Sequence, residues 1–344
     1  MLTKGPAFVQ ISTFFDDRQH TLSLPVGNCV AKGLPCGTNT GEQMTTRNPS
    51  VSVCLPVYNG EAYLADAIQS VLSQTFSDLE LIVSDNASTD RTGALCREAE
   101  ARDPRVRYFR SETNNGLAWN FNRAFHLATG RYLVWIGHDD IMEPDYIMRC
   151  VDEMEGHADA LLCFSNSRYI DGDGNVMEEM DLKNTGAAKT PSERFGLILF
   201  DPSCDPICGV MKVEFLRQTR LHPGYADSDR VLLAELGFRG RFRKINEYLF
   251  SRRMHRHQVT ATLDRWERTV IFDPSKSGKI ICPWWLELFG LVGAIHRAPI
   301  SLREQLRAYK RLYWWALIHK SFFYLDLLRG LDAPTRFTFG RGHE

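Results

Sequence analysis

Short apolar stretches alternate with segments of helical periodicity along much of the chain. The first stretch, 51–57, ends at a turn-prone Tyr-Asn-Gly, and apolar residues at helical spacing follow it over 64–72. A second stretch, 79–83, is followed in the same way by a helix expected to begin near Asp90. Short strands that alternate with helices of this length are typical of crossover units built on a parallel sheet.

The alternation continues through three more strands and two more helices. Strands are expected at 106–109, 132–136 and 160–165, and helices at 117–128 and after Pro144. The pattern predicts an α/β fold with a Rossmann-like, mostly parallel sheet covered by helices on both faces.

Polar side chains follow three of the predicted strands. They are Tyr58 and Asn59 after the first strand, Asp85 and Asn86 after the second, and 138–140 after the fourth. The carboxyl ends of parallel strands meet at one edge of a sheet, and ligands bind in the crevice there. The sequence therefore predicts one binding site built from three loops.

The charge balance excludes several classes of protein. The 344 residues include 41 Lys and Arg against 42 Asp and Glu, which gives a net charge of −1. A dedicated nucleic-acid-binding protein needs a basic excess, so we expect no nucleic-acid partner. With 44% hydrophobic residues, the chain can also bury a core, which argues against global disorder.

Cysteine usage and the apolar runs predict a cytoplasmic location. The nine cysteines are an odd number scattered over a long chain, which favours reduced thiols over a disulfide scaffold. The first 20 residues contain no apolar stretch of the kind found in a secretory leader. The longest apolar run, 280–295, is interrupted by Pro283 and Glu287 and is too short to span a bilayer.

Asp139 and Asp140 are adjacent carboxylates at a strand end, and they repel one another unless a cation neutralises them. A hard divalent cation does so, with a bound diphosphate completing its oxygen shell. A helix cap before Pro144 is the alternative interpretation. The neighbouring polar loops favour a nucleotide diphosphate, with its base near Asp85 and its phosphates near Asp139.

Five stretches of this sequence, in order and spacing, resemble the catalytic core of the family 2 glycosyltransferases. These enzymes have the GT-A fold and transfer sugars from nucleotide donors. The matching stretches are 53–59, 82–90, 115–116 with Asn122, 128–132, and 138–140 with 144–145. The resemblance implies a nucleotide-sugar half at 51–155 and an acceptor half at 156–260 of one GT-A domain. A poorly ordered extension is expected at 1–50, and a helical region at 261–344.

The resemblance assigns roles to the residues of the crevice. Those expected to bind the nucleotide are Pro56, Tyr58, Asn59, Asp85, Asn86, Asp90, Asn122, Arg123 and Asp139. Asp85 would accept a hydrogen bond from the base. Asp139 and Asp140 would contact ribose and a metal, Mn²⁺ or Mg²⁺. His255, in an Arg-x-x-His element, would be a further metal ligand or a diphosphate contact, or else an ordinary surface histidine.

Two positions depart from the family pattern. Gly137 stands where the Asp-x-Asp-Asp element begins with Asp, which puts the ribose contact in question. Phe121 stands in place of a common Arg, which leaves open the residue that steadies the diphosphate. Arg123 is one candidate, and an exposed helix position is the alternative interpretation for it.

The acceptor-side segment 225–236 contains the candidate base. Asp229 is expected to open a helix and accept the proton of the acceptor, with Asp227 in reserve. The alternative for Asp229 is a simple helix cap, an ordinary role for Asp.

Together these features predict an inverting, metal-dependent glycosyltransferase. It would use a nucleotide-diphosphate sugar, UDP-sugar by default, and a hydroxyl acceptor on a glycan or lipid-linked saccharide. A sugar nucleotidyltransferase is one alternative, although 56–60 is not the Gly-rich phosphate loop it would need. A catalytically silent nucleotide-sugar-binding protein of the same fold is another.

The C-terminal region mixes basic and aromatic residues at helical spacing. Members of this group include Arg303, Arg307, Lys310, Tyr313 and Trp314. Such a mixture suits peripheral contact with a membrane surface, as a lipid-linked acceptor would require. Packing on the catalytic domain or on a second subunit of a homo-oligomer is the alternative.

Overall fold

Four parallel strands and their connecting helices form the first half of a nine-stranded sheet. The computed structural model describes residues 48–186, 188–201, 203–255 and 263–332. In chain order the first elements are β1 (Val51–Val57), α1 (Leu64–Leu72), β2 (Leu79–Asp85), α2 (Thr92–Arg102), β3 (Val106–Arg110), α3 (Leu117–Leu127) and β4 (Tyr132–Trp135). The strands lie in the order β3-β2-β1-β4, all parallel, as the alternation predicts.

The second half of the sheet is mixed. Its elements are β5 (Ile141–Met142), α4 (Tyr146–Glu155), β6 (Ala160–Ile170), β7 (Val176–Met180), α5 (Pro191–Phe200), the 3₁₀ helix η1 (Asp205–Cys208), β8 (Val210–Lys212), α6 (Val213–Leu216), α7 (Ser228–Arg239) and β9 (Arg241–Arg253). Strand β8 lies antiparallel between β4 and β6, whereas β6 and β9 are parallel. Of these strands the sequence pattern predicts β6, at 160–165, whereas β8 is too short to show a period.

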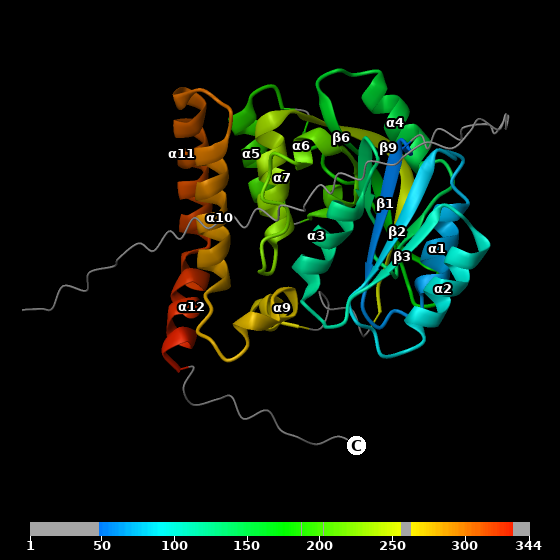
Figure 1. The fold of residues 1–344 in the computed structure, drawn as a ribbon. Helices are drawn as coiled ribbons and strands as arrows, with labels where there is room; N and C mark the ends of the chain where they lie inside the picture. The colour runs from blue at the N-terminus through cyan, green and yellow to red at the C-terminus, as the bar shows by residue number, and fades with distance from the viewer. Residues whose placement is uncertain (1–47, 187, 202, 256–262, 333–344) are drawn as a thin grey trace, which may run out of the picture. The chain divides into compact units, whose positions relative to one another are not determined.

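Helices cover both faces of the sheet. Alternate residues of β1 point to opposite sides, so Val53 and Leu55 pack with α1 and α4, and Cys54 packs with α3 and α7. Figure 1 shows α1 and α2 on one side of the parallel strands and α3 and α7 on the other. The predicted α/β fold, with both faces covered, is therefore confirmed.

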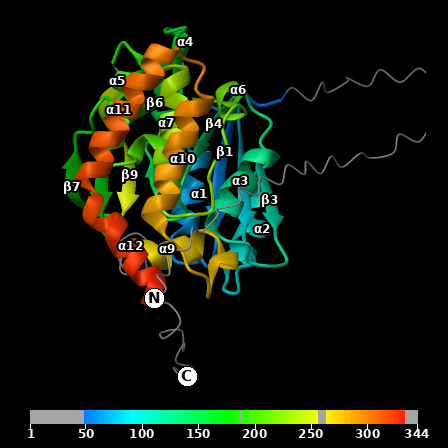
Figure 2. The same cartoon turned by 90° about the vertical axis from the view of Figure 1, so that its left-hand side faces the viewer.

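Helices also make up the described part of the C-terminal region, as the sequence predicts. They are α9 (Arg265–Phe272), the 3₁₀ helix η2 (Pro274–Lys276), α10 (Pro283–Arg297), α11 (Leu302–Ile318) and α12 (Lys320–Asp332). Asp264 and Glu267 form a capping box at the start of α9, and Ser301 caps α11. Helix α10 packs on α7, and α11 packs on α5 (Figure 2).

The expected boundary near 260 and the residues 333–344 lie outside the described residues, as does most of the 1–50 extension. Within the described ranges, no helix is both long and apolar enough to cross a bilayer.

Candidate active site

The loops that follow β1 and β2 are joined by hydrogen bonds. The backbone N–H of Asn59 donates to Ser88 Oγ at 2.9 Å, and Asn59 Oδ1 accepts from the N–H of Thr89 at 2.8 Å. Asp90 Oδ2 accepts from the N–H of Glu61 at 3.1 Å. Asn59 adopts a φ of 51°, a left-handed conformation that asparagine tolerates. Asn59 and Asp90, both predicted to bind nucleotide, thus bring the two loops together.

The other predicted nucleotide residues of these loops differ in exposure. Pro56 is buried in β1 opposite Ser84, whereas Tyr58 is 45% exposed at the strand end. Asn86 is buried, and its amide donates to Asn114 Oδ1 and to the carbonyl of Gly116. Of these three residues, Tyr58 is the one whose side chain is exposed and can contact a ligand.

Asp85 is fully buried, and its carboxylate is already bonded on both sides. Oδ1 accepts from the N–H of Ser88 at 2.8 Å, and Oδ2 accepts from the Tyr108 hydroxyl at 2.7 Å. Arg110 Nε lies 3.7 Å from Oδ2. A nucleotide base could bond to Asp85 only by sharing or displacing one of these partners, so the predicted base contact remains a prediction.

The loop after β4 meets the first loop at the same edge of the sheet. A Cβ atom at Gly60 would lie 2.6 Å from Cδ2 of His138, so the two loops are in contact there. Asp139 and Asp140 follow directly, before the short strand β5. The three loops predicted to converge do lie together.

Residues at the end of β9 surround the two carboxylates. His255 Nε2 lies 2.9 Å from Asp139 Oδ2, and the backbone N–H of Arg253 donates to Asp140 Oδ1 at 3.1 Å. The guanidinium of Arg253 is buried and donates to the Asp139 carbonyl. Burial, followed by the charge of Asp139, raises the pKa of Asp140 to about 7. Asp140 is thus costly to ionise as it stands.

One oxygen from each carboxylate, Asp139 Oδ1 and Asp140 Oδ2, lies close to Gly137. We call this arrangement the Gly137 cradle. A Cβ atom there would lie 2.7 Å from both Asp139 Oδ1 and Asp140 Oδ2. The two oxygens therefore converge on Gly137 itself, and position 137 has no room for a side chain while they stay there. A side chain at position 137 would require one or both of these carboxylates to move.

The cradle suits a divalent cation that takes its remaining ligands from a diphosphate. Among the residues described, no three His, Cys, Asp or Glu side chains form a ready metal cluster. Asp139, Asp140 and His255 accordingly do not close around a common point. Mg²⁺ and similar cations are often held by one or two carboxylates together with substrate phosphates, and the two converging oxygens fit that pattern.

Asn122 and Arg123 lie on α3 and not in the loops that form the crevice. The Asn122 amide exchanges two hydrogen bonds with the backbone of His222, at 2.9 and 3.0 Å. Arg123 donates to the carbonyls of Phe109 and Arg110 at the end of β3. Both residues line a hollow of about 430 Å³ along α3. Arg123 also lies over the ring of Trp119, so both residues are engaged by the protein itself, and a diphosphate contact for either remains a prediction.

Phe121 has a packing role where the family pattern has Arg. Its ring centroid lies 6.2 Å from Trp135 and 5.0 Å from His222. Burial lowers the pKa of His222 to about 4, so its imidazole is neutral near pH 7. An aromatic ring is compatible with this buried neighbour, whereas a guanidinium would need a partner there.

On the acceptor side, Asp227 and Asp229 have distinct environments. Asp227 is the N-cap residue of α7, and its carboxylate is held by Arg265 and Arg268, each at 2.8 Å. Asp229 lies in the first turn, where burial and then the charge of Asp227 raise its pKa to about 6. The prediction that Asp229 opens the helix is therefore wrong: Asp227 is the N-cap residue, and Asp229 lies two residues further on, inside the first turn.

The 3₁₀ helix η1 packs against β4 of the first half of the sheet and against α7, which carries Asp229. Burial raises the pKa of the Cys208 thiol in η1, and the charges of both Asp140 and Asp229 act on it. Arg252, next to Arg253 on β9, is paired with Asp205 at the other end of η1. Asp140 of the nucleotide-sugar half and Asp229 of the acceptor half are thus both near enough to η1 for their charges to act on Cys208.

The sequence pattern did not predict an ion-pair cluster that lies next to Asp227. Glu287 on α10 is 1% exposed and lies between Arg230 and Arg265, with its Oε1 3.0 Å from Arg230 Nε. Arg265 also pairs with Asp227, so α7, α9 and α10 are joined through charges. No local pattern marks Glu287, because its partners lie far away in the sequence.

Replacing Glu287 by alanine should strongly destabilise the protein. The change leaves two buried guanidinium groups without their shared partner, and breaking a buried pair in this way costs about 3–5 kcal/mol. The matched control is Glu98→Ala on α2, which removes an exposed pair with Arg102 and should cost less than about 1 kcal/mol. Urea unfolding measures both free energies, and equal losses would contradict a structural role for Glu287.

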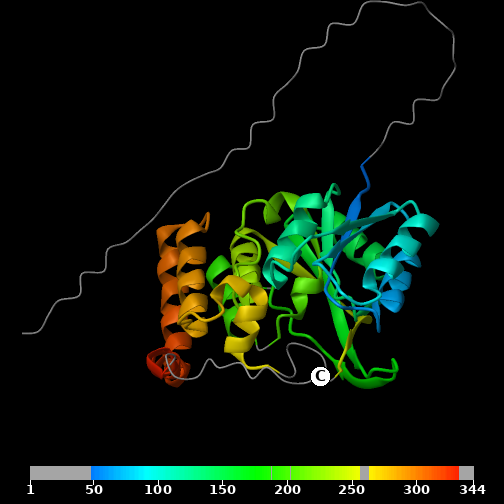
Figure 3. The ribbon, with the colours of Figure 1, turned by 60° about the horizontal axis from the view of Figure 1, so that its bottom comes forward.

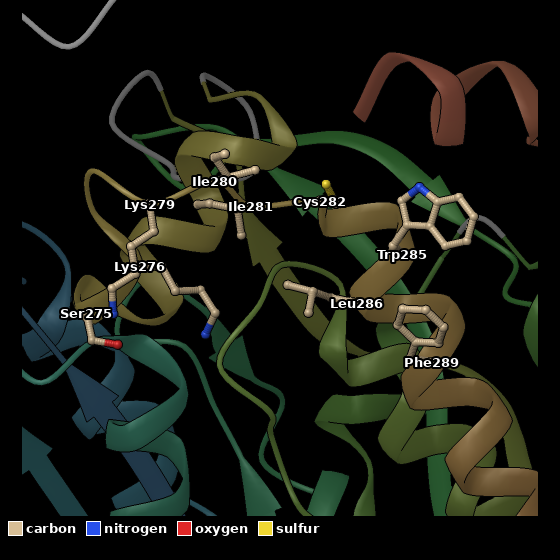
Figure 4. Close-up of a pocket in the computed structure, with 9 residues that line it drawn as sticks. All are labelled: Ser275, Lys276, Lys279, Ile280, Ile281, Cys282, Trp285, Leu286 and Phe289. Carbon is tan, nitrogen blue, oxygen red and sulfur yellow. The ribbon is translucent and has the colours of Figure 1, made fainter. Parts of the chain in front are cut away.

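A shallow hollow of about 490 Å³ lies beside the acceptor-side segment (Figure 4). Lys276 and Lys279 border it on one side, and Trp285 and Phe289 lie on α10. Lys276 Nζ donates to the carbonyl of Gly224 at 2.7 Å, three residues before Asp227. This hollow therefore adjoins the segment that carries the candidate base.

Comparison with known proteins identifies the domain. The model of the family "Glycosyl transferase family 2" matches residues 52–211. Chondroitin synthase of Escherichia coli is 36% identical over 131 residues, which are 38% of this chain and 19% of that protein. A glycosyltransferase of Methanocaldococcus jannaschii, itself uncharacterized, is 33% identical over 133 residues, which are 46% of its length. The matched region is thus less than two thirds of either relative.

The fold is shared with solved glycosyltransferase structures. Staphylococcus aureus TarS 1–349, in complex with UDP-GlcNAc, superposes with a TM-score of 0.51 at 15% identity. The superposition covers 85% of this chain and 93% of that one, so it includes the second half of the sheet. Taken with the family match, these findings establish that the chain contains a family 2 glycosyltransferase domain of GT-A fold.

Proposed function

We propose that this chain is an inverting glycosyltransferase that uses a nucleotide-diphosphate sugar and a hydroxyl acceptor. The observation that carries the proposal is the presence of two separate carboxylate groups around η1. Asp139 and Asp140 converge on the cradle at Gly137, and Asp229 lies on the acceptor side with a raised pKa. An inverting displacement needs one group at the leaving diphosphate and one base at the acceptor.

A UDP-sugar is the donor that the comparisons favour. The TarS structure holds UDP-GlcNAc, and relatives include chondroitin and hyaluronan synthases. Those enzymes suggest a glycan or lipid-linked saccharide as the acceptor. Exposed Tyr58 and the loops after β1 and β2 would line the nucleotide pocket.

Asp139 and Asp140 would hold a divalent cation, Mn²⁺ or Mg²⁺, together with the donor diphosphate. When bound, such a cation neutralises the negative charge that develops on the departing diphosphate. The buried guanidinium of Arg253 bonds to the Asp139 carbonyl and fixes the position of this loop. His255 would either join the ligands or orient Asp139 through their contact.

Asp229 would take the proton of the acceptor hydroxyl as that oxygen bonds to the anomeric carbon. The bond from this carbon to the diphosphate breaks on the opposite side, so the configuration inverts. Asp227 is already bonded to two arginines, so its oxygens are less available to an acceptor hydroxyl than those of Asp229.

The rate of transfer should fall on the acid side with an apparent pKa near 6. Asp229 faces Asp227, Arg230 and Glu287, and burial with the charge of Asp227 raises its pKa to about 6. Below that pH the carboxyl group is protonated and cannot accept a proton. Asp227→Asn removes one of the charges that raise this pKa, so the acid limb of kcat/KM should move to lower pH. A limb that stays in place or moves upward would contradict the assignment.

A thermal-shift panel tests donor binding without an acceptor. We expect UDP and UDP-sugars with Mn²⁺ to raise Tm, because a ligand at 100 times its Kd stabilises by about 2.7 kcal/mol. EDTA should remove the shift. Stabilisation by nucleoside triphosphates with none by UDP-sugars would favour a nucleotidyltransferase instead.

A further inference from the structure

Helices α11 and α12 expose a large apolar surface. Eleven large apolar residues between 302 and 328 are exposed: Leu302, Leu306, Tyr313, Trp314, Leu317, Ile318, Phe322, Tyr324, Leu325, Leu327 and Leu328. Leu302, Leu306, Tyr313 and Leu317 recur at helical spacing and form one stripe along α11. Figure 3 shows the two helices on the side of the domain away from α1 and α2.

The charged residues of this surface are cations. Every exposed charged side chain from 302 to 329 is basic: Arg303, Arg307, Lys310, Lys320 and Arg329. The two acidic residues of this stretch are turned inward. Glu304 pairs with Arg307 and accepts from the N–H of Ser192, and buried Asp326 accepts from the N–H of Trp284. The outer face thus carries positive charge beside apolar groups.

Only the inner side of α11 and α12 is buried by packing against the rest of the protein. Ala308, Leu312, Trp315 and Phe323 are buried in a core shared with α5, α7 and α10. Packing of the C-terminal helices on the catalytic domain therefore explains their inner face. Among the described residues, Arg307 also pairs with Glu304, Arg329 with Asp264, and Phe322 stacks on Trp284, whereas most of the apolar side chains of the outer face and the cations Arg303 and Lys310 are exposed to solvent.

We propose that this outer face, the α11–α12 face, binds the surface of an anionic membrane. Helices that lie in the interface place apolar side chains at the acyl boundary and Lys or Arg among the headgroups. Each basic residue near an anionic surface adds to the attraction. A second copy of the chain fits less well, because a two-fold contact through this face would bring like charges together.

Co-sedimentation with lipid vesicles tests the proposal on the full chain without any nucleotide. The chain should sediment with phosphatidylcholine vesicles containing phosphatidylglycerol, less with phosphatidylcholine alone, and less again at high salt. The double variant Arg303→Glu and Lys310→Glu should weaken binding by at least about fivefold for each cation removed. Tyr313→Ser with Leu317→Ser should also weaken it. The control Arg97→Glu changes an exposed cation on α2 and should bind like the parent.

Three outcomes would overturn the proposal. One is the absence of sedimentation with anionic vesicles at low salt. Another is equal binding by the parent and by the double charge-reversal variant. The third is a stable dimer in light scattering that Tyr313→Ser with Leu317→Ser dissociates, because the face would then belong to a second copy. Because binding is measured without donor or acceptor, its failure would leave the proposed transferase activity untouched.

Discussion

Replacing Asp229 by asparagine should reduce glycosyl transfer by about 10²–10⁴-fold, the usual cost of removing a general base. Asp229 is half-buried in the first turn of α7, and desolvation and the charge of Asp227 raise its pKa to about 6. Asparagine has nearly the same shape but cannot accept the proton. Metal-dependent binding of UDP should survive, because Asp229 is not among the residues that form the Gly137 cradle.

Asp227→Asn is the matched comparison for this prediction. Asp227 is held by Arg265 and Arg268, so its loss should lower stability and reduce the rate less than Asp229→Asn does. Initial rates of UDP release with an acceptor, and Tm values for the free proteins, measure both effects. If Asp227→Asn has the larger effect on rate, the base is Asp227. If neither variant loses activity, Asp229 is only a residue of the first helical turn.

Asp139→Asn should abolish the Mn²⁺-dependent part of nucleotide binding while leaving the fold intact. The carboxylates of Asp139 and Asp140 converge on the cradle at Gly137, and removing one charge removes half of the anionic ligand set. Gly137→Ala should have a similar effect by a different route. Its Cβ atom would lie 2.7 Å from both carboxylate oxygens, so these carboxylates would have to move from the positions in which they would hold a cation.

Gly156→Ala is the control for the glycine variant. A Cβ atom at Gly156 would lie 3.5 Å from the carbonyl oxygen of Asp152, an ordinary contact, so this variant should bind like the parent. Thermal shift by UDP, with and without Mn²⁺, measures all three variants. An Asp139→Asn protein that keeps the full metal-dependent shift and turns over like the parent would refute the metal assignment.

The first half of the fold could be predicted because its elements carry strong local periods. β1 and β2 are continuous buried runs, and their order along the chain places Val57 beside Asp85 at one sheet edge. The convergence of three loops follows from this topology. Strand β9 could not be predicted in the same way, because it alternates apolar residues with Arg, Lys and Glu along a partly exposed strand.

The contacts of individual side chains were less predictable. Asp85 and Asn122 match the family pattern, yet their polar atoms bond to Tyr108, Ser88 and the backbone of His222. These partners lie up to 100 residues away, so the sequence around each residue does not identify them. Glu287 is the extreme case, since a carboxylate in an apolar run appears as an interruption until its two arginines are known.

Slow hydrolysis of UDP-sugars by the isolated protein tests the central claim most directly. With Mn²⁺ and no acceptor, a glycosyltransferase with this site should transfer the sugar to water and release UDP, and EDTA should stop the release. Asp139→Asn should release little or none. Release of pyrophosphate from a nucleoside triphosphate and a sugar phosphate, without UDP release from any UDP-sugar, would contradict the account.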